Sequence, residues 1–336
     1  MITRRLAARR LVAAAALAGC AAVGAALTLP AAAQEKVLKA SDVHPLGYPT
    51  VEAVVRMGQK LEEATDGRLS IQMYPSGQLG GEKEMIEQAQ VGALDLARIS
   101  VGPVGTVVDE LNVFNLPFVF RDEEHMRKVI DGEIGQELFQ RIMDSPDTKL
   151  VPLAWMDAGS RSIYADKPVR TPEDLQGLKI RMMGNPIFVD TLNAMGGNGI
   201  SMGFNELYSA LQTGVVDGAE NNPPTFLTHN HYQVAGTYSL TEHLIIPEIL
   251  VMSRRTWDSL SPEDQDLLRK LGREAQQEER QLWDEMTEKS VAELKEKGVT
   301  FVEDVDKEAF KESVQPVYDK YGEQYAELLA RIEAVQ

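Results

Sequence analysis

The residue with the most distinctive chemistry is an arginine inside a strand-like segment. Arg181 lies at the centre of Lys179-Ile180-Arg181-Met182-Met183. An apolar sheet excludes a guanidinium group unless an anionic partner accompanies it. That partner is either a carboxylate of the protein, in a structural salt bridge, or the carboxylate of a ligand. Arginine suits the second role because its planar group donates two parallel hydrogen bonds that orient a carboxylate. Arg161, which follows a small-residue segment, can supply a second donor to the ligand carboxylate or hold Arg181 in place.

The spacing patterns of common catalytic sites are absent from the sequence. It has no G-x-x-x-x-G-K-[ST] phosphate loop, no G-x-S-x-G elbow and no H-E-x-x-H helix. His229 and His231 have no third ligand at a suitable spacing, so we expect exposed or capping histidines rather than a metal site. The single cysteine, Cys20, cannot form an internal disulfide or a Cys-based zinc or iron–sulfur site. We therefore expect no catalytic residues, no metal and no cofactor.

The elements that must position these residues alternate between strands and helices. The hydrophobic periodicity predicts strands over 37–41, 69–73, 94–99, 150–155 and 179–183, and helices over 48–64, 82–91, 186–195 and 205–212. Strands separated by helices indicate βαβ units and a mostly parallel sheet. No repeat or low-complexity linker occurs after residue 33, so we expect the domains to be joined by ordered crossovers.

One predicted helix is unusually long. Ser261 can cap a helix that begins at Pro262, and the only helix breaker before Gly298 is Gly272. Such a helix has about 36 residues and a length of about 54 Å, more than the width of a small domain. Two structures fit this pattern: two helices kinked at Gly272, or one helix that braces two lobes. A brace suits lobes that move as rigid bodies about a hinge.

The N-terminal segment has the pattern of a secretory signal peptide, residues 1–33. Four arginines precede the uncharged, Ala-rich run Leu11–Leu29, and Ala31-Ala32-Ala33 forms an A-x-A cleavage site. A membrane anchor fits less well because the run is rich in Ala and Gly and ends in small residues. A competing cut is the lipobox-like Leu17-Ala18-Gly19-Cys20, which would leave the chain lipid-anchored at Cys20. Either cut predicts a periplasmic protein.

Composition bounds the class of protein. The chain has 336 residues, with 51 acidic and 34 basic residues and a net charge of −17, which becomes −21 without the signal segment. This acidity argues against nucleic acid as a partner, because phosphate contact requires a basic face. The length predicts about two domains. With 43% hydrophobic and 25% charged residues, the composition is that of a folded soluble protein.

Three segments, residues 74–82, 177–181 and 210–221, resemble the solute-binding proteins of tripartite ATP-independent periplasmic (TRAP) transporters. The resemblance implies an α/β, two-lobed, periplasmic-binding-protein-like fold with a long helix bracing both lobes. We expect lobe I over 34–158, completed by about 247–287, and lobe II over 159–246, completed by about 288–336. The implied partners are a small-molecule organic acid and the membrane permease subunits of a sodium-coupled transporter. We expect the receptor to be a monomer.

The resemblance also implies roles for individual residues. The family's carboxylate-clamping arginine falls on Arg181, and its supporting arginine falls on Arg161. The ligand-contacting asparagine after Gly-x-Glu falls on Asn221. An aromatic residue that lies against the ligand falls on Phe204, with an ordinary core position as the alternative. The acid after Gln-Leu-Gly falls on Glu82, which can accept hydrogen bonds from sugar hydroxyls.

Other residues bear on the choice of ligand. Where sialic-acid-binding relatives carry a glutamate, this chain has Ser100, which argues against sialic acid. Residues 42–50 and 220–225 look like members of the family that take hexuronates such as glucuronate and galacturonate. They add His44 and Asn222 to the expected ligand-binding residues, although either can instead cap a helix or a turn. A smaller acid, such as a C4-dicarboxylate or a 2-keto acid, is the alternative ligand. A secreted sugar-acid-processing enzyme is the alternative class.

Overall fold

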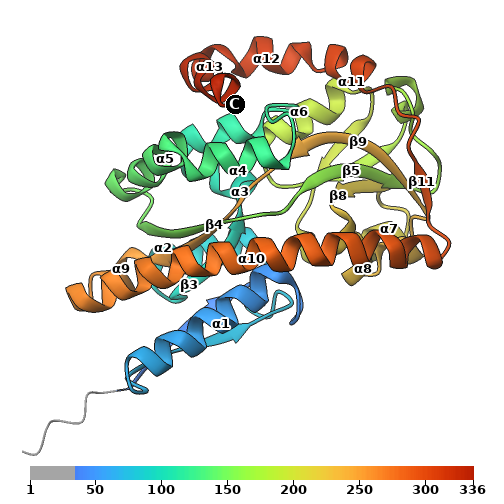
Figure 1. Cartoon of the computed structure of the whole chain (residues 1–336). Helices are drawn as coiled ribbons and strands as arrows, with labels where there is room; N and C mark the ends of the chain where they lie inside the picture. Colours follow the sequence, from blue (N-terminus) through green and yellow to red (C-terminus); the bar gives the residue numbers. More distant parts are fainter. Residues whose placement is uncertain (1–34) are drawn as a thin grey trace, which may run out of the picture. The chain divides into compact units, whose positions relative to one another are not determined.

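The computed structural model describes residues 35–336, which contain two β-sheets (Figure 1). Sheet A consists, in spatial order, of β2 (Leu69–Tyr74), β1 (Lys36–Ser41), β3 (Leu96–Ser100), β10 (Glu248–Ser253) and β4 (Leu150–Met156). Sheet B consists of β11 (Thr300–Val302), β9 (Thr237–Ile245), β5 (Ser160–Ala165), β8 (Gly218–Asn221), β6 (Lys179–Met182) and β7 (Asn198–Ser201). The expected signal peptide and Cys20 lie outside the described residues.

Helices connect the strands and cover the sheets. They are α1 (Pro49–Ala64), α2 (Glu82–Val91), α3 (Val101–Val104), α4 (Glu123–Asp131), α5 (Glu133–Asp144), α6 (Pro186–Ala194), α7 (Leu207–Gln212), α8 (Pro223–Thr228), α9 (Arg254–Trp257), α10 (Pro262–Glu296), α11 (Lys307–Ser313), α12 (Gln315–Tyr321) and α13 (Ala326–Ala334). Every element that we bounded from the sequence is present within about two residues. The expected helix over 205–212 begins with a 3₁₀ turn, Phe204–Glu206, before α7. Val51, Val54 and Leu61 form the buried face of α1.

Both sheets are mostly parallel, as expected, and each contains one strand that runs the opposite way, β10 in sheet A and β5 in sheet B. The βαβ units give parallel pairs, since β1 is parallel to β2 and β3, and β6 is parallel to β7 and β8. The antiparallel pairs involve the strands that cross between the sheets. β4 leads to β5 through residues 157–159, and β9 returns to β10 through residues 246–247. The first connection runs from sheet A to sheet B, and the second runs back from sheet B to sheet A. For this reason β10 runs antiparallel to β4, and β9 runs antiparallel to β5.

The long helix α10 is one helix, so the kinked alternative is wrong. The Ser261 side chain accepts a hydrogen bond from the Asp264 backbone N–H at 3.2 Å, as expected of the cap. Gly272 lies against β4, where an added Cβ would be 2.5 Å from the Leu153 carbonyl oxygen. The glycine therefore allows the helix to approach the strand closely. α10 packs against α1 and β4 on one side of the crossing and against α8 on the other, as the predicted brace requires (Figure 1).

The C-terminal helices also contact both parts of the chain. α11 packs on β9 and α12 on α6, whereas α13 packs on α5, which lies against β4. An ion pair of 2.7 Å between Arg331 Nη1 and Glu137 joins α13 to α5. The division into lobes with the bounds given above stays a prediction. In residues 35–336, no helix combines the length and apolar composition needed to cross a membrane.

Candidate ligand-binding site

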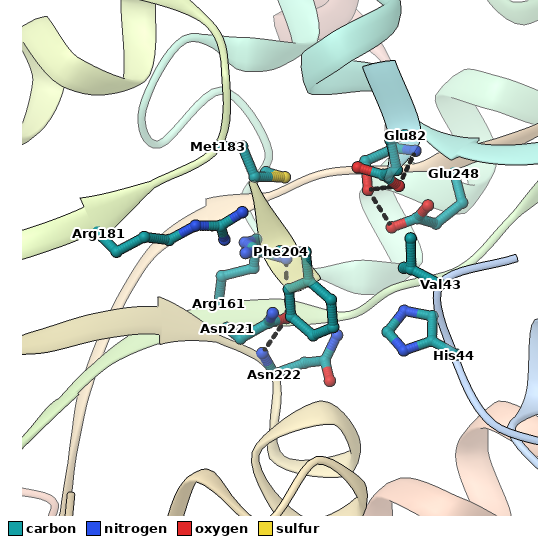
Figure 2. Close-up of a pocket in the computed structure, with 11 residues that line it drawn as sticks. Val43, His44, Glu82, Arg161, Arg181, Met183, Phe204, Asn221, Asn222 and Glu248 are labelled. Carbon is teal, nitrogen blue, oxygen red and sulfur yellow. Dashed lines mark hydrogen bonds between the residues drawn. The ribbon is translucent and has the colours of Figure 1, made fainter. Parts of the chain in front are cut away.

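The eight expected ligand-binding residues all line one cavity between the two sheets (Figure 2). His44, Glu82 and Ser100 come from the sheet A side, and the sheet B side supplies Arg161, Arg181, Phe204, Asn221 and Asn222. Val43, Met183 and Glu248, which the sequence did not indicate, complete the lining. The empty space among these side chains is about 310 Å³, a figure that includes space open to solvent. The structure brings these residues together, and their roles in binding stay predictions.

Arg181 is a buried cation that has no anionic partner among residues 35–336. Its side chain extends from β6 and is 3% exposed. Nε donates to the Met202 carbonyl oxygen at 2.9 Å, while Nη1 is buried and has no hydrogen-bond partner in residues 35–336. The guanidinium carbon lies 5.7 Å from the centre of the Phe204 ring. Burial lowers the pKa of Arg181. The structural salt bridge that the sequence left open is not formed among the described residues.

Arg161 is held by the protein itself. Its Nε and Nη2 donate to the two carboxylate oxygens of Glu220 at 2.6 and 2.8 Å, a bidentate ion pair. Its Nη1 donates to Asn221 Oδ1 at 2.8 Å, and the same oxygen accepts from the Asn222 backbone N–H at 2.9 Å. Both contacts fix the Asn221 amide with its oxygen turned toward the protein. Arg161 thus positions Asn221, and its own charge is balanced by Glu220.

The opposite side of the cavity is built around Arg98, which sequence reasoning missed. Arg98 is 1% exposed in β3 and forms ion pairs with Asp42, Glu82 and Glu248. Burial opposes its charge, yet the three carboxylates raise the pKa of Arg98 well above its usual value. Burial also raises the pKa of Glu248, and the ion pair with Arg98 counteracts this shift by favouring the ionised carboxylate. A signal for Arg98 existed, since Leu96-Ala97-Arg98-Ile99 resembles the arginine-bearing strand of Arg181.

The Glu82 carboxylate is held in place by hydrogen bonds from the protein. Its Oε1 accepts hydrogen bonds from the Ser100 backbone N–H and hydroxyl, each at 2.9 Å, and from Arg98 Nη1 at 3.1 Å. Glu82 is the first residue of α2, where the positive end of the helix dipole favours a carboxylate. The helix and the strand together fix one oxygen of this carboxylate at the cavity wall.

Of the two histidines expected to be exposed or capping, His229 is the half-buried C-cap residue of α8 and His231 is buried. His44 Nδ1 and His229 Nε2 are 3.0 Å apart, a contact that joins the loop after β1 to the end of α8. His231 is 1% exposed, and its Nδ1 lies 2.8 Å from the Tyr164 hydroxyl. Burial lowers the pKa of His44 well below its usual value, that of His229 to about 4 and that of His231 to about 3. Neutral rings are therefore favoured in this environment.

The capping alternative holds for Asn222. Its Oδ1 accepts from the Thr225 backbone N–H at 2.8 Å and caps α8, while Nδ2 donates to the Ala158 carbonyl at 2.9 Å. His44 makes no such cap with its ring, which stacks on Tyr48 at 3.8 Å between centroids. Phe204 is half-buried. Within residues 35–336 no group of three or more His, Cys, Asp or Glu side chains is arranged to hold a metal ion.

Two sheets joined by short crossings, a bracing helix and a polar cavity between the sheets define a two-lobed solute receptor. The chain belongs to the bacterial extracellular solute-binding proteins, family 7, whose model matches residues 40–324. This confirms the resemblance to TRAP solute-binding proteins and the expected fold class. The family and its similar structures are solute-binding receptors rather than enzymes, and the family acts with membrane transporter components.

Several solved TRAP periplasmic solute-binding proteins are similar over their full length. One from Pseudomonas putida F1, with bound D-glucuronate, is 58% identical with a TM-score of 0.88, covering 90% of this chain and 98% of that chain. One from Xanthobacter autotrophicus Py2, with bound β-D-galacturonate, is 41% identical with a TM-score of 0.86, covering 89% and 100%.

A third relative, from Citrobacter koseri, has been solved in two states. With bound D-glucuronate it is 49% identical with a TM-score of 0.88, covering 90% of this chain and 100% of that chain. Its apo, open structure is 46% identical with a TM-score of 0.78, covering 88% and 99%. The arrangement of residues 35–336 is therefore more similar to the ligand-bound state of this relative than to its open state.

Proposed function

We propose that this protein is a periplasmic receptor that captures a hexuronate, glucuronate or galacturonate, and delivers it to the permease subunits of a TRAP transporter. The observation that carries the proposal is Arg181, whose buried Nη1 has no partner among the described residues although it lines the cavity. A carboxylate is the ligand group that satisfies such a guanidinium best. The similar proteins with bound D-glucuronate and β-D-galacturonate support this ligand class.

The remaining lining supplies partners for hydroxyl groups. Glu82 and Glu248 offer carboxylate oxygens, and Asn221 offers an amide nitrogen because its oxygen is already used. Phe204 gives an apolar surface on which a sugar ring can lie. In this proposal Arg181 clamps the carboxylate, Arg161 positions Asn221, and His44, Ser100 and Asn222 shape the wall. The lobes, 34–158 with about 247–287 and 159–246 with about 288–336, close on the solute.

Calorimetric titration with glucuronate, galacturonate and glucose tests the proposal. Glucose retains the ring and hydroxyls but lacks the carboxylate, so we expect uronates to bind and glucose not to bind. A ligand at 100 times its dissociation constant should also stabilise the fold by about 2.7 kcal/mol in a thermal-shift assay. Recovering the uronate unchanged after incubation separates a receptor from a sugar-acid-processing enzyme. Binding of none of the uronates would overturn the proposal.

Processing and assembly are part of the same proposal. Cleavage of a signal peptide after Ala33 leaves Gln34 at the N-terminus, whereas lipoprotein processing leaves a modified Cys20. Intact-mass spectrometry of the exported protein distinguishes these products, and we expect Gln34. Light scattering during gel filtration tests the expected monomer. A diacylglycerol-modified Cys20 would instead place the receptor at the membrane surface.

A further inference from the structure

The two sides of the cavity carry opposite net charge. On the sheet B side, the carboxylate of Glu220 neutralises the charge of Arg161, so the positive charge of Arg181 is not compensated. No ion pair involving Arg181 forms within residues 35–336. Figure 2 shows Arg181 on one side of the cavity and the carboxylates of Glu82 and Glu248 on the other.

The sheet A side has an excess of negative charge. Among residues 35–336, Arg98 is the cation that forms ion pairs there, and it faces the carboxylates of Asp42, Glu82 and Glu248. The side chains of Asp42 and Glu248 are 0% and 4% exposed, so bulk water screens them little. Burial lowers the pKa values of His44 and His229, which disfavours a compensating positive charge on either ring. The protein therefore leaves this side short of cations.

The two carboxylates that line the cavity share one hydroxyl donor of the protein. The Ser100 hydroxyl oxygen lies 2.9 Å from Glu82 Oε1 and 3.0 Å from Glu248 Oε1. A hydroxyl carries one hydrogen, so Ser100 can donate to only one of these oxygens. A solute that presents hydroxyl groups here supplies further donors, which ionised carboxylate oxygens can accept at their remaining lone pairs. A solute that presents a carboxylate brings a further acceptor and a further negative charge.

We propose, building on the proposed function, that Glu82 and Glu248 restrict this receptor to solutes with a single carboxylate. They accept hydrogen bonds from sugar hydroxyls and repel the second carboxylate of a diacid whose first carboxylate is held by Arg181. Like charges facing each other in a water-poor site are strongly unfavourable. The rejected class includes the aldarates, in which both ends of the sugar chain are carboxylates, and the C4-dicarboxylates. Glu248 is thus a specificity-determining residue.

The test compares glucuronate with glucarate, a diacid of the same carbon number, by calorimetric titration. We expect the parent to bind glucarate at least about 100-fold more weakly than glucuronate. Glu248→Gln should raise the ratio of glucarate to glucuronate affinity by at least about tenfold, because it removes one charge and keeps the side-chain shape. Glu82→Gln should act in the same direction and the double variant further. Glu133→Gln, on the exposed start of α5, is the matched control and should leave the ratio unchanged.

The outcomes separate this inference from the proposed function. If the parent binds glucuronate and glucarate equally well, or if the ratio stays within about threefold in both single variants, the inference is wrong and the hexuronate receptor stands. If the parent binds neither glucuronate nor galacturonate, the proposed function fails. Circular dichroism and thermal melting show whether each variant still folds when Arg98 has lost one of its three carboxylate partners. Two independent single variants keep the test decisive if one of them does not fold.

Discussion

Replacing Arg181 with lysine keeps the charge in the cavity and removes the geometry that we assign to the clamp. The guanidinium uses Nε for the Met202 carbonyl, at 2.9 Å, and this leaves its two terminal nitrogens for a ligand carboxylate. A lysine ammonium is a single point at the end of the chain and cannot reproduce a planar pair of parallel donors. It also cannot hold the Met202 carbonyl and both carboxylate oxygens in the same directions.

The expected loss follows from the number of bonds removed. At least one charge-assisted hydrogen bond to the ligand is lost, which is worth about 1.5–3 kcal/mol. Affinity for glucuronate should therefore fall by about ten- to a hundredfold in Arg181→Lys. Arg181→Ala should lose more, because no cation then faces the buried carboxylate. The lost bond to Met202 affects the free energy of unfolding rather than the choice of ligand.

Calorimetric titration with glucuronate and with a non-sugar monocarboxylate measures this effect after circular dichroism confirms the fold of each variant. Both ligands should weaken in Arg181→Lys, since both present the same group to the clamp. Arg170→Lys is the matched control, because Arg170 is exposed and pairs with Asp304 on the surface. An affinity of Arg181→Lys within about threefold of the parent, only about 0.7 kcal/mol, would refute the clamp.

Three further predictions concern the conformation of the receptor. Burial lowers the pKa of His229 from its usual value near 6.5 to about 4, so the stabilisation from the neutral ring beside His44 is complete above about pH 6.5 and is lost as the pH falls toward 4. Glucuronate affinity, measured by titration, should therefore fall by about tenfold between pH 7 and pH 5, and less in His229→Asn; an equal fall in both proteins would contradict this. Gly272→Ala should lower the melting temperature by a few degrees because its Cβ would meet the Leu153 carbonyl at 2.5 Å, whereas Gly236→Ala, with nothing within 4 Å, should change it little. Saturating glucuronate should compact the protein in small-angle scattering, and glucose should not; identical profiles would argue against hinge closure.

Sequence reasoning succeeded where one local signal determined the structure. The periodicity of α1, with its buried Val51, Val54 and Leu61, needs no knowledge of the partner surface. α10 was bounded by its cap at Ser261 and by Gly298 after its end. The eight cavity residues came from motifs at strand ends and loops, which the fold brings to one place. What the sequence could not decide was whether Gly272 ends the helix, because that depends on how close β4 approaches.

The features that were missed depend on contacts between distant segments. The pairing of Arg98 with Glu248 joins residues 150 positions apart, and it exists because β10 inserts between β3 and β4. No local pattern predicts that insertion, in which β10 runs opposite to its neighbours. The contact of His229 with His44 spans 185 positions, so no local pattern indicates it. The chemistry of Arg98 was visible in its strand, but its partners were not.

The contacts that join the two sides of the cavity explain how specificity can be tied to closure. The Tyr48 hydroxyl lies 2.9 Å from Thr225 Oγ1, next to the contact between His44 and His229, and both contacts join the sheet A side to α8. If the lobes close on the solute as proposed, these bonds form as the two sides meet, and the same motion brings Glu248 to face Arg181 across the cavity. A solute that satisfies Arg181 but repels the carboxylates opposite it holds the two sides apart and prevents these bonds. Discrimination would then appear as a failure to close as well as a loss of direct contacts.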